Sequence, residues 1–148
     1  MLKYKIGILA SGKGSTLKAL CDAVEHNILN VSIKCILTNN VSLKVIGETY
    51  NIPLCIIPYN SQTDNRYEYN IKLYNYLKIY NLDMVVLAGW NFIVNNDFIQ
   101  QFPVILNLHP ALPNSFIGQN CIRKAYDSFK RGEIKYTGSM VHRVTDNL

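Results

Sequence analysis

Hydrophobic and polar positions change their spacing along the chain in a way that predicts strands and helices in alternation. Apolar runs bounded by glycine, asparagine or proline predict buried strands, whereas apolar residues three or four positions apart predict helices. The predicted strands are residues 4–10, 31–38, 52–58, 82–89, 104–109 and 136–144. The predicted helices are residues 17–24, 42–50, 66–80, 95–102 and 119–131. This alternation predicts an α/β fold, with a doubly wound, mostly parallel sheet and helices on both of its faces.

The strand predicted at 82–89 is the most apolar and should lie at the centre of the sheet, because a central parallel strand is buried on both faces. The loop after it, residues 90–94, is apolar and aromatic, and a flat ligand could lie there. The helix predicted at 66–80 carries one apolar stripe that should pack inward. The stripe consists of Tyr67, Ile71, Tyr74 and Leu77.

Composition narrows the class of protein. With 148 residues, 49% of them hydrophobic and 17% charged, the chain has enough apolar side chains for one globular domain, residues 1–148. No apolar run reaches the length of a membrane span, and the polar, glycine-broken amino terminus does not look like a signal peptide. Three of the four cysteines lie in apolar runs and none forms a C-x-x-C pair. This favours buried free thiols in a reducing cytoplasm over disulfides or zinc.

A glycine-rich segment, residues 11–16, connects the first predicted strand to the first predicted helix. Backbone N–H groups at such a helix start can bind an anion beside the positive end of the helix dipole. The segment matches neither G-x-G-x-x-G nor G-x-x-x-x-G-K-[ST], so it predicts neither a dinucleotide site nor a P-loop. A turn that is glycine-rich only for packing is the alternative. The net charge of +5 suits an anionic ligand, while the lack of a Lys/Arg-dense block argues against nucleic acid.

The strand predicted at 104–109 ends in two polar residues at alternate positions, Asn107 and His109. Residues two apart in a strand project from the same face, and Pro110 should end the ladder there. The alternative is a purely structural role, with Asn107 as a cap at the end of the strand and His109 as a turn residue. Two other loops, 11–16 and 89–94, should meet this one at the carboxyl edge of the sheet, where open α/β sheets bind their ligands. That convergence favours a functional site.

Four segments together resemble the folate-dependent formyltransferases. They are LASGKGSTLKAL from Leu9, VVLAGW from Val85, ILNLHPALP from Ile105 and GSMVHRVTD from Gly138, in the order of that family. The S-G-x-G-S loop resembles the branch that acts on glycinamide ribonucleotide and not the methionyl-tRNA branch. The resemblance implies a Rossmann-like formyltransferase fold. It also implies transfer of a formyl group from 10-formyltetrahydrofolate to the amine of glycinamide ribonucleotide, a cytoplasmic step of purine biosynthesis.

The resemblance further implies roles for individual residues. An amine that attacks a formyl carbon leaves a negatively charged oxygen, which an amide donor and an imidazolium can stabilise. Asn107 matches that donor, and His109 matches a histidine that stabilises the oxyanion and helps to move the proton. His142 matches a further family position, and structural support is its expected role.

Two sets of binding residues follow from the same match. The substrate set is Gly14, Ser15, Thr16, Arg66, Gly89, Asn91 and Pro110, of which the first three match a backbone cradle for a phosphate. The set that lines the folate pteridine pocket is Leu87, Phe92, Ile93, Val94, Phe98 and Val144. The implied partners are small molecules, namely a reduced folate as cosubstrate and a phosphoribosyl glycinamide, with no metal, nucleic acid or membrane.

Some positions depart from the family pattern. Thr16 replaces an asparagine, Phe92 replaces an arginine of some relatives, and Ile122 stands where a histidine often occurs. The family's third catalytic residue is an aspartate that would fall one residue after Leu148, and Asp146 matches a different position. The resemblance therefore predicts a domain that is truncated at its carboxyl end.

Three alternatives remain at this stage. A formyltetrahydrofolate hydrolase would share N-x-H and a segment like residues 116–118, but it would have no phosphorylated acceptor to hold. A formyltransferase that acts on an amino sugar nucleotide is the second. A binding or regulatory homologue with impaired catalysis is the third, because the aspartate is missing.

Overall fold

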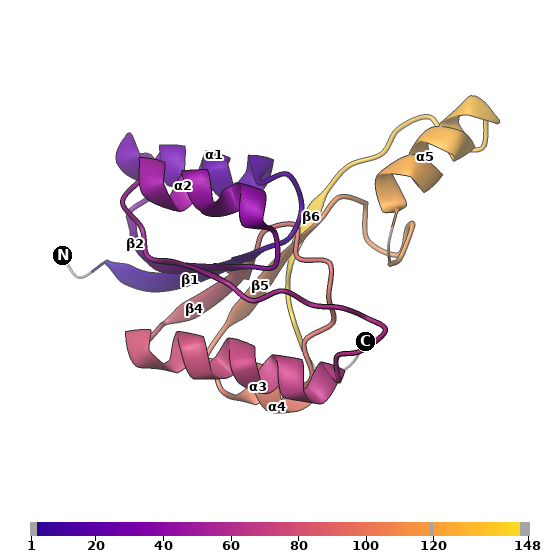
Figure 1. The fold of residues 1–148 in the computed structure, drawn as a ribbon. Helices are drawn as coiled ribbons and strands as arrows, with labels where there is room; N and C mark the ends of the chain where they lie inside the picture. Colours follow the sequence, from indigo (N-terminus) through magenta and orange to yellow (C-terminus); the bar gives the residue numbers. More distant parts are fainter. Residues whose placement is uncertain (1–2, 119, 146–148) are drawn as a thin grey trace.

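A single six-stranded sheet organises the protein. A computed structural model describes residues 3–118 and 120–145 of the chain. The strand order is β3-β2-β1-β4-β5-β6, with β1 to β5 parallel and β6 antiparallel to β5 (Figure 1). This confirms the predicted doubly wound, mostly parallel fold and places β4 at the centre. The strands are β1 (Tyr4–Ala10), β2 (Val31–Thr38), β3 (Leu54–Ile56), β4 (Met84–Leu87), β5 (Ile105–His109) and β6 (Met140–Arg143).

Helices cover both faces of the sheet (Figure 1). One pair, α1 and α2, lies on one face, and α3 and α4 lie on the other. The helices are α1 (Ser15–Glu25), η1 (Val41–Leu43), α2 (Lys44–Thr49), α3 (Arg66–Leu77), η2 (Lys78–Tyr80), α4 (Asn96–Gln100) and α5 (Cys121–Lys130). Within residues 3–118 and 120–145, no helix has the length and apolar character needed to cross a membrane.

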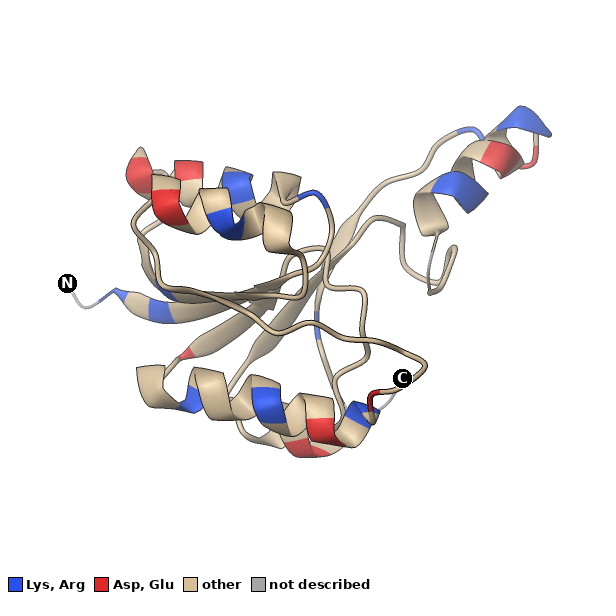
Figure 2. Ribbon diagram, in the orientation of Figure 1, with Lys and Arg blue, Asp and Glu red and all other residues tan. Residues whose placement is uncertain are grey.

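Two apolar layers result from the alternation of side chains along the strands. Ile8 and Ile36 pack with Leu17 on the α1 side of the sheet, and Leu9 and Leu37 pack with other buried residues on the α3 side. Charged residues lie mainly on the helices, and α1, α3 and α5 each carry both signs (Figure 2). The described surface therefore presents no block of a single sign on these helices.

The predicted boundaries of three strands are wrong. The strand predicted at 82–89 is limited to Met84–Leu87. The third strand is limited to Leu54–Ile56 because Pro53 and Pro58 flank it, and proline cannot donate to a ladder. The last strand begins at Met140 and not at residue 136, because residues 134–139 return as an irregular connection from α5. Local patterning placed these three strands but not their ends.

The stripe predicted for α3 is wrong at two of its four positions, because Leu77 is buried and Tyr74 packs against the core, but the other two are exposed. Tyr67 and Ile71 are 54% and 42% exposed, and the side chains that α3 buries are Tyr69, Asn70, Leu73 and Leu77. The inward face contains a polar residue, so a stripe chosen by hydrophobicity alone was rotated away from it. Asn70 is buried because its amide donates to the Arg66 carbonyl at 2.8 Å and its Oδ1 accepts from Asn95 N at 3.1 Å.

The last helix, α5, projects away from the two layers at the end of long connections (Figure 1). Its apolar face is largely exposed, with Ile122, Tyr126 and Phe129 at 68%, 55% and 56%. These side chains and the connection that follows α5 line a cavity of about 450 Å³, to which Pro110 also contributes. The predicted start of this helix at Gln119 lies outside the described residues, and the helix begins at Cys121.

All four cysteines are free thiols, as predicted, and three of them are buried. The buried ones are Cys21, Cys35 and Cys121, whereas Cys55 in the apolar segment around β3 is only partly buried. Burial raises the pKa of the Cys21 thiol to about 11 and that of Cys35 to about 12. Since the thiolate is the reactive form, these two side chains act as small apolar packing residues at neutral pH.

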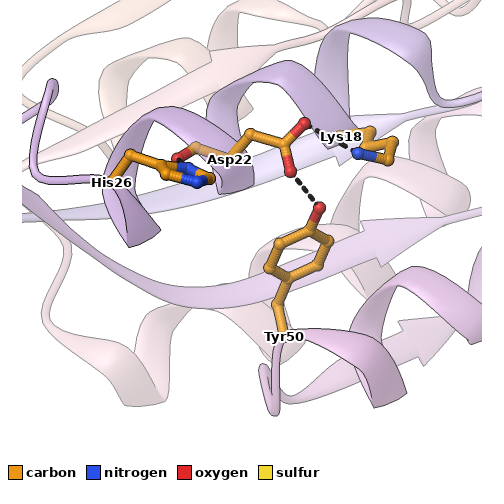
Figure 3. A network of polar contacts seen from close by, with 4 residues as sticks. All are labelled: Lys18, Asp22, His26 and Tyr50. Carbon is orange, nitrogen blue, oxygen red and sulfur yellow. Dashed lines mark hydrogen bonds and ion pairs between the residues drawn. The ribbon is translucent and has the colours of Figure 1, made fainter.

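A polar network joins the two helices on the α1 side of the sheet (Figure 3). The carboxylate of Asp22 accepts from Lys18 Nζ at 2.7 Å and from the hydroxyl of Tyr50, the residue that ends α2. The ring of His26 donates from Nδ1 to the Asp22 carbonyl at 2.7 Å. The hydrogen bonds from Lys18 and then Tyr50 lower the pKa of the Asp22 carboxyl.

We expect this network to make stability depend on pH in a defined direction. Because the pKa of Asp22 is lowered in the folded state, its contribution is present above the ordinary value of 3.8 and is lost as pH falls through the lower folded value. Replacing Asp22 by asparagine should therefore flatten the acid side of the stability profile. Urea unfolding of both proteins between about pH 5 and pH 2 measures this.

The matched control is Glu48→Gln, which removes an exposed carboxylate whose ion pair with Lys44 spans 3.5 Å on α2. This variant should retain the acid slope of the unsubstituted protein. Equal slopes for Asp22→Asn and the unsubstituted protein would show that the network does not couple folding to pH.

Candidate functional site

Three loops meet at the carboxyl edge of the sheet, where the strand order reverses between β1 and β4. Ligands of open α/β sheets bind at such a switch point. The backbone N–H of Ser11 donates to the Gly89 carbonyl at 3.2 Å, and Asn91 N donates to the Ser11 hydroxyl at 3.3 Å. A third bond, from the Asn40 amide to the Gly12 carbonyl at 3.0 Å, joins the loop after β2. Of the three loops predicted to converge, residues 11–16 and 89–94 are therefore hydrogen-bonded to one another.

The start of α1 has the form of an anion site. Gly14 precedes the helix with φ +80°, and no side chain caps the first turn. The first backbone N–H groups of the helix therefore lack a side-chain cap beside the positive end of the helix dipole. Ser15 is exposed and Thr16 is half-buried, so the first turn is open to a ligand.

Gly14 is needed for two separate reasons, which gives a testable expectation. A Cβ at this position would lie 2.6 Å from Leu43 Cδ2 and 2.9 Å from Ile46 Cδ1, and the positive φ disfavours any L side chain. We expect Gly14→Ala to cost about 1–2 kcal/mol for the left-handed backbone and about 1–3 kcal/mol more for overpacking. Urea unfolding at neutral pH measures the sum.

The matched control for this substitution is Gly132→Ala. Gly132 also has a positive φ, +73°, but an added Cβ there meets nothing within 4 Å. This variant should show only the backbone cost of about 1–2 kcal/mol. Equal losses at the two positions would mean that Leu43 and Ile46 yield freely to the added methyl group.

One lateral row of side chains crosses all six strands and changes from apolar to polar at its end. Side chains paired across neighbouring strands share one face of a sheet. This row lies on the α3 side, because Leu9, Leu37 and Leu87 belong to the apolar layer there. From β3 to β6 the paired residues are Cys55, Leu37, Leu9, Leu87, Asn107 and His142. The amide and the imidazole therefore continue an apolar layer to one end of the sheet.

Asn107 and His142 are in direct contact. They are opposite one another in the antiparallel β5–β6 pair, and Asn107 Nδ2 lies 3.1 Å from His142 Nε2. The other ring nitrogen of His142, Nδ1, lies 3.2 Å from the Arg143 carbonyl oxygen. Both side chains are partly buried.

His109 ends β5 two residues beyond Asn107. The last residue of β5 that pairs with β4 is Asn107, opposite Leu87, so His109 extends beyond the end of β4 and pairs only with Met140 of β6. Alternation places its side chain on the same face as that of Asn107. The strand ends at Pro110 as predicted, and Ala111 is completely buried, which fixes the loop that follows.

The loop after β4 contributes an aromatic cluster to this edge. The rings of Tyr69 and Trp90 stack with centroids 6.3 Å apart, and Phe92 lies edge-on to Trp90 at 5.3 Å and to Tyr59 at 4.9 Å. Offset and edge-on contacts of this kind stabilise beyond the area that they bury. The cluster holds residues 90–94 against α3 in a defined shape.

The six residues that the family resemblance assigns to the folate pocket differ in how deeply their side chains are buried. Leu87, Val94 and Phe98 are buried in the apolar layer, Phe98 at only 2% exposed, and they support the loop from beneath. Ile93 is 53% exposed, and Phe92 and Val144 are partly buried against the same layer. Ile93, Phe92 and Val144 are thus the members whose side chains a ligand could contact directly.

Arg66 is the first residue of α3, and its side chain is exposed. Asn65 caps that helix by accepting from Tyr67 N at 2.8 Å, and the buried Asn70 then ties α3 to the start of α4. Sequence reasoning missed Asn70 and Asn40, and it placed Ser11 in the glycine-rich loop without its bridging role. Asn40 stands directly before a helix start, a signal that does not distinguish a cap from a bridge, and Asn70 within α3 carried no such signal.

Two cavities of the described chain are lined by residues other than Asn107 and His109. One lies beneath α5 and is lined in part by Pro110 of the predicted acceptor set, and the other is lined by residues of α2 and the turn before β3. In the part of the chain that the structure describes, no group of three or more His, Cys, Asp or Glu side chains could hold a metal ion.

Comparisons with known proteins agree on one family. Residues 4–148 match the family model described as formyl transferase. Phosphoribosylglycinamide formyltransferase of Dictyostelium discoideum is 31% identical over 99% of this chain and 79% of its own length. Formyltetrahydrofolate deformylase of Escherichia coli (strain K12) is 30% identical over 99% of this chain but only half of its own length. The crystal structure of glycinamide ribonucleotide transformylase 1 from Symbiobacterium toebii superimposes with a TM-score of 0.85, at 25% identity, over 99% of this chain and 68% of that chain.

Proposed function

The chain belongs to the formyl transferase family, and from this premise we propose that it transfers a formyl group from 10-formyltetrahydrofolate to the amine of glycinamide ribonucleotide. The reaction is a step of purine biosynthesis. In it the acceptor nitrogen bonds to the formyl carbon, the bond from that carbon to the folate nitrogen breaks, and a proton passes from the acceptor amine to the folate.

The observation that carries this proposal is the combination of two sites on one sheet edge. A polar group made of Asn107, His109 and His142 lies at the carboxyl end of β5, and the open start of α1 after Gly14 lies at the carboxyl end of β1. An acceptor that carries both an amine and a phosphate needs both. The Ser11–Gly89 and Asn91–Ser11 hydrogen bonds connect the loop before α1 to the loop after β4, and β4 pairs with β5 through Leu87 and Asn107.

Each residue then has a specific task. The Asn107 amide donates to the oxygen that becomes negative as the amine adds to the formyl carbon, and such a preorganised donor is worth a few kcal/mol. His109 stabilises the same oxygen and takes part in moving the proton. Gly14, Ser15 and Thr16 hold the phosphate through backbone N–H groups. Arg66, Gly89, Asn91 and Pro110 complete the acceptor side.

The formyl donor fits the apolar side of the edge. A pteridine ring is flat, and the loop at residues 89–94 presents Ile93 and Phe92 to it. Beneath these two side chains lies a buried layer that contains Leu87, Val94 and Phe98. Val144 lies beside Ile105, to whose carbonyl its N–H donates at 2.8 Å. These residues bind and orient the folate.

An assay with both substrates tests the proposal. The chain is incubated with 10-formyltetrahydrofolate in the presence and absence of glycinamide ribonucleotide, and formylated acceptor and free formate are measured separately. We expect formylated acceptor, and we expect turnover of the folate to depend on the acceptor. Absence of formylation together with absence of binding to either substrate, measured by calorimetry, would overturn the proposal.

A hydrolase is the second candidate, and the similarity to the Escherichia coli deformylase favours it. Water would then be the acceptor, and formate would appear at the same rate with or without glycinamide ribonucleotide. The open helix start at Gly14 argues for the transferase, because water needs no anion site. The same assay distinguishes the two reactions.

A further inference from the structure

The antiparallel pairing of β6 with β5 places His142 beside Asn107, although the two residues are far apart in the sequence. His142 lies 35 positions after Asn107, yet the β5–β6 register sets the two residues directly opposite one another. Its two ring nitrogens have different neighbours, the Asn107 amide nitrogen at 3.1 Å and the Arg143 carbonyl oxygen at 3.2 Å. The side chain of Arg143 is engaged elsewhere, since it donates to the Pro103 carbonyl at 2.8 Å.

The chemistry of these neighbours selects one state of the ring. A carbonyl oxygen only accepts, so the nitrogen that faces it, Nδ1, carries the proton. An amide nitrogen only donates, so the nitrogen that faces Asn107, Nε2, must be the unprotonated acceptor. Both contacts therefore require the same neutral tautomer of His142. An imidazolium could not accept the bond from Asn107.

The neutral tautomer and the direction of the Asn107 amide go together. If the amide were turned over, Oδ1 would face the lone pair of Nε2, and two acceptors would oppose one another at 3.1 Å. The observed direction satisfies one N–H of the amide and leaves the second N–H for another acceptor. Histidine tautomers are commonly set in this way by the bond at the opposite nitrogen.

We propose that His142 is a positioning residue that locks the Asn107 amide with its NH₂ group toward the reacting oxygen. The inference rests on the proposed function, because the reacting oxygen is that of the transferred formyl group. His142 acts through Asn107 and does not itself touch the substrate. Its contribution is to prevent the amide from presenting its own oxygen to a developing negative charge.

Kinetics of formyl transfer test the coupling. We expect His142→Leu, which lacks an acceptor, to lower kcat by about ten- to a hundredfold with little change in KM, less than the roughly 100- to 1,000-fold expected for losing the donor. His142→Gln supplies an oxygen that can accept from Asn107 and should recover most of this loss. In an Asn107→Ala background, His142→Leu should cause no further loss, since residues that act as a unit are not additive.

Val141→Thr is the matched control, because Val141 is in the same strand, is 64% exposed and projects from the opposite face. It should leave kcat unchanged, and unfolding of every variant is followed in parallel. Two results would overturn the inference. One is a loss in His142→Leu that persists in full when Asn107 is already alanine, and the other is a glutamine variant no better than leucine.

A spectroscopic measurement keeps this inference separate from the proposed function. Two-bond ¹H–¹⁵N spectra of the unliganded chain should show His142 neutral with its proton on Nδ1, and the side-chain amide resonances of Asn107 should shift in His142→Leu. A proton on Nε2, or unshifted Asn107 resonances, would overturn the positioning role even in an active enzyme. If the chain forms no formylated product but shows these signatures, the proposed function fails and the locked amide stands.

Discussion

Replacing His109 by alanine is expected to lower kcat for formyl transfer by about 10²–10⁴-fold, the range for losing a positioned general acid–base group. His109 is the last residue of β5 and extends beyond the end of β4, so its ring lies at the open edge where both substrates must meet. The loss should appear in kcat, because the anion site after Gly14 and the apolar loop after β4 remain intact. Steady-state rates with both substrates measure it.

His26→Ala is the control for this variant. His26 follows the last residue of α1, is exposed and bonds only to a backbone carbonyl among the contacts found for it. Its removal should leave formyl transfer unchanged. Activity of His109→Ala within about tenfold of the unsubstituted chain would exclude a general acid–base role.

The second large effect is expected for Asn107. Asn107→Ala should lower kcat by about 10²–10³-fold, equivalent to about 2.7–4 kcal/mol of lost oxyanion stabilisation. The side chain lies at the polar end of a row that is apolar across four strands, so the amide projects from a rigid support. The same rate assay measures the loss.

Asn107→Asp makes this test sharper because it preserves shape and removes the N–H donors. A carboxylate would also repel the developing negative charge, so this variant should be at least as impaired as alanine. The control is Asn75→Ala. It removes an exposed amide on α3 whose oxygen accepts a hydrogen bond from Lys78. If Asn107→Asp retained normal activity, donation by this amide would not contribute to the reaction.

Short-range patterns in the sequence determined much of the sheet and one half of the site. The first two strands, β1 and β2, have the predicted ends, because polar residues flank each mainly apolar segment on both sides. Asn107 and His109 were assigned to one face from their spacing alone, because the period of a strand is two. The uncapped helix after Gly14 was likewise visible as strand, glycine turn and helix.

Local patterns misplaced features that depend on partners far along the chain. The inward face of α3 includes Asn70, whose burial is favourable only because Asn95 N and the Arg66 carbonyl are there to satisfy its amide. The amphipathic pattern of α5 was readable, but its distance from the sheet was not (Figure 1). A hydrophobic stripe indicates which face is apolar and not what will cover it.

By itself, the sequence determined the layer architecture and the residue types at the carboxyl edge, because strand and helix periods and glycine turns are local properties. Only the tertiary structure decided that the last strand runs antiparallel and sets His142 against Asn107, in a pairing between residues 35 positions apart. Register between strands depends on the whole connection between them, including the excursion through α5, and no local period encodes it. That pairing brings the two side chains into contact, and the contact joins one tautomer of His142 to one direction of the Asn107 amide.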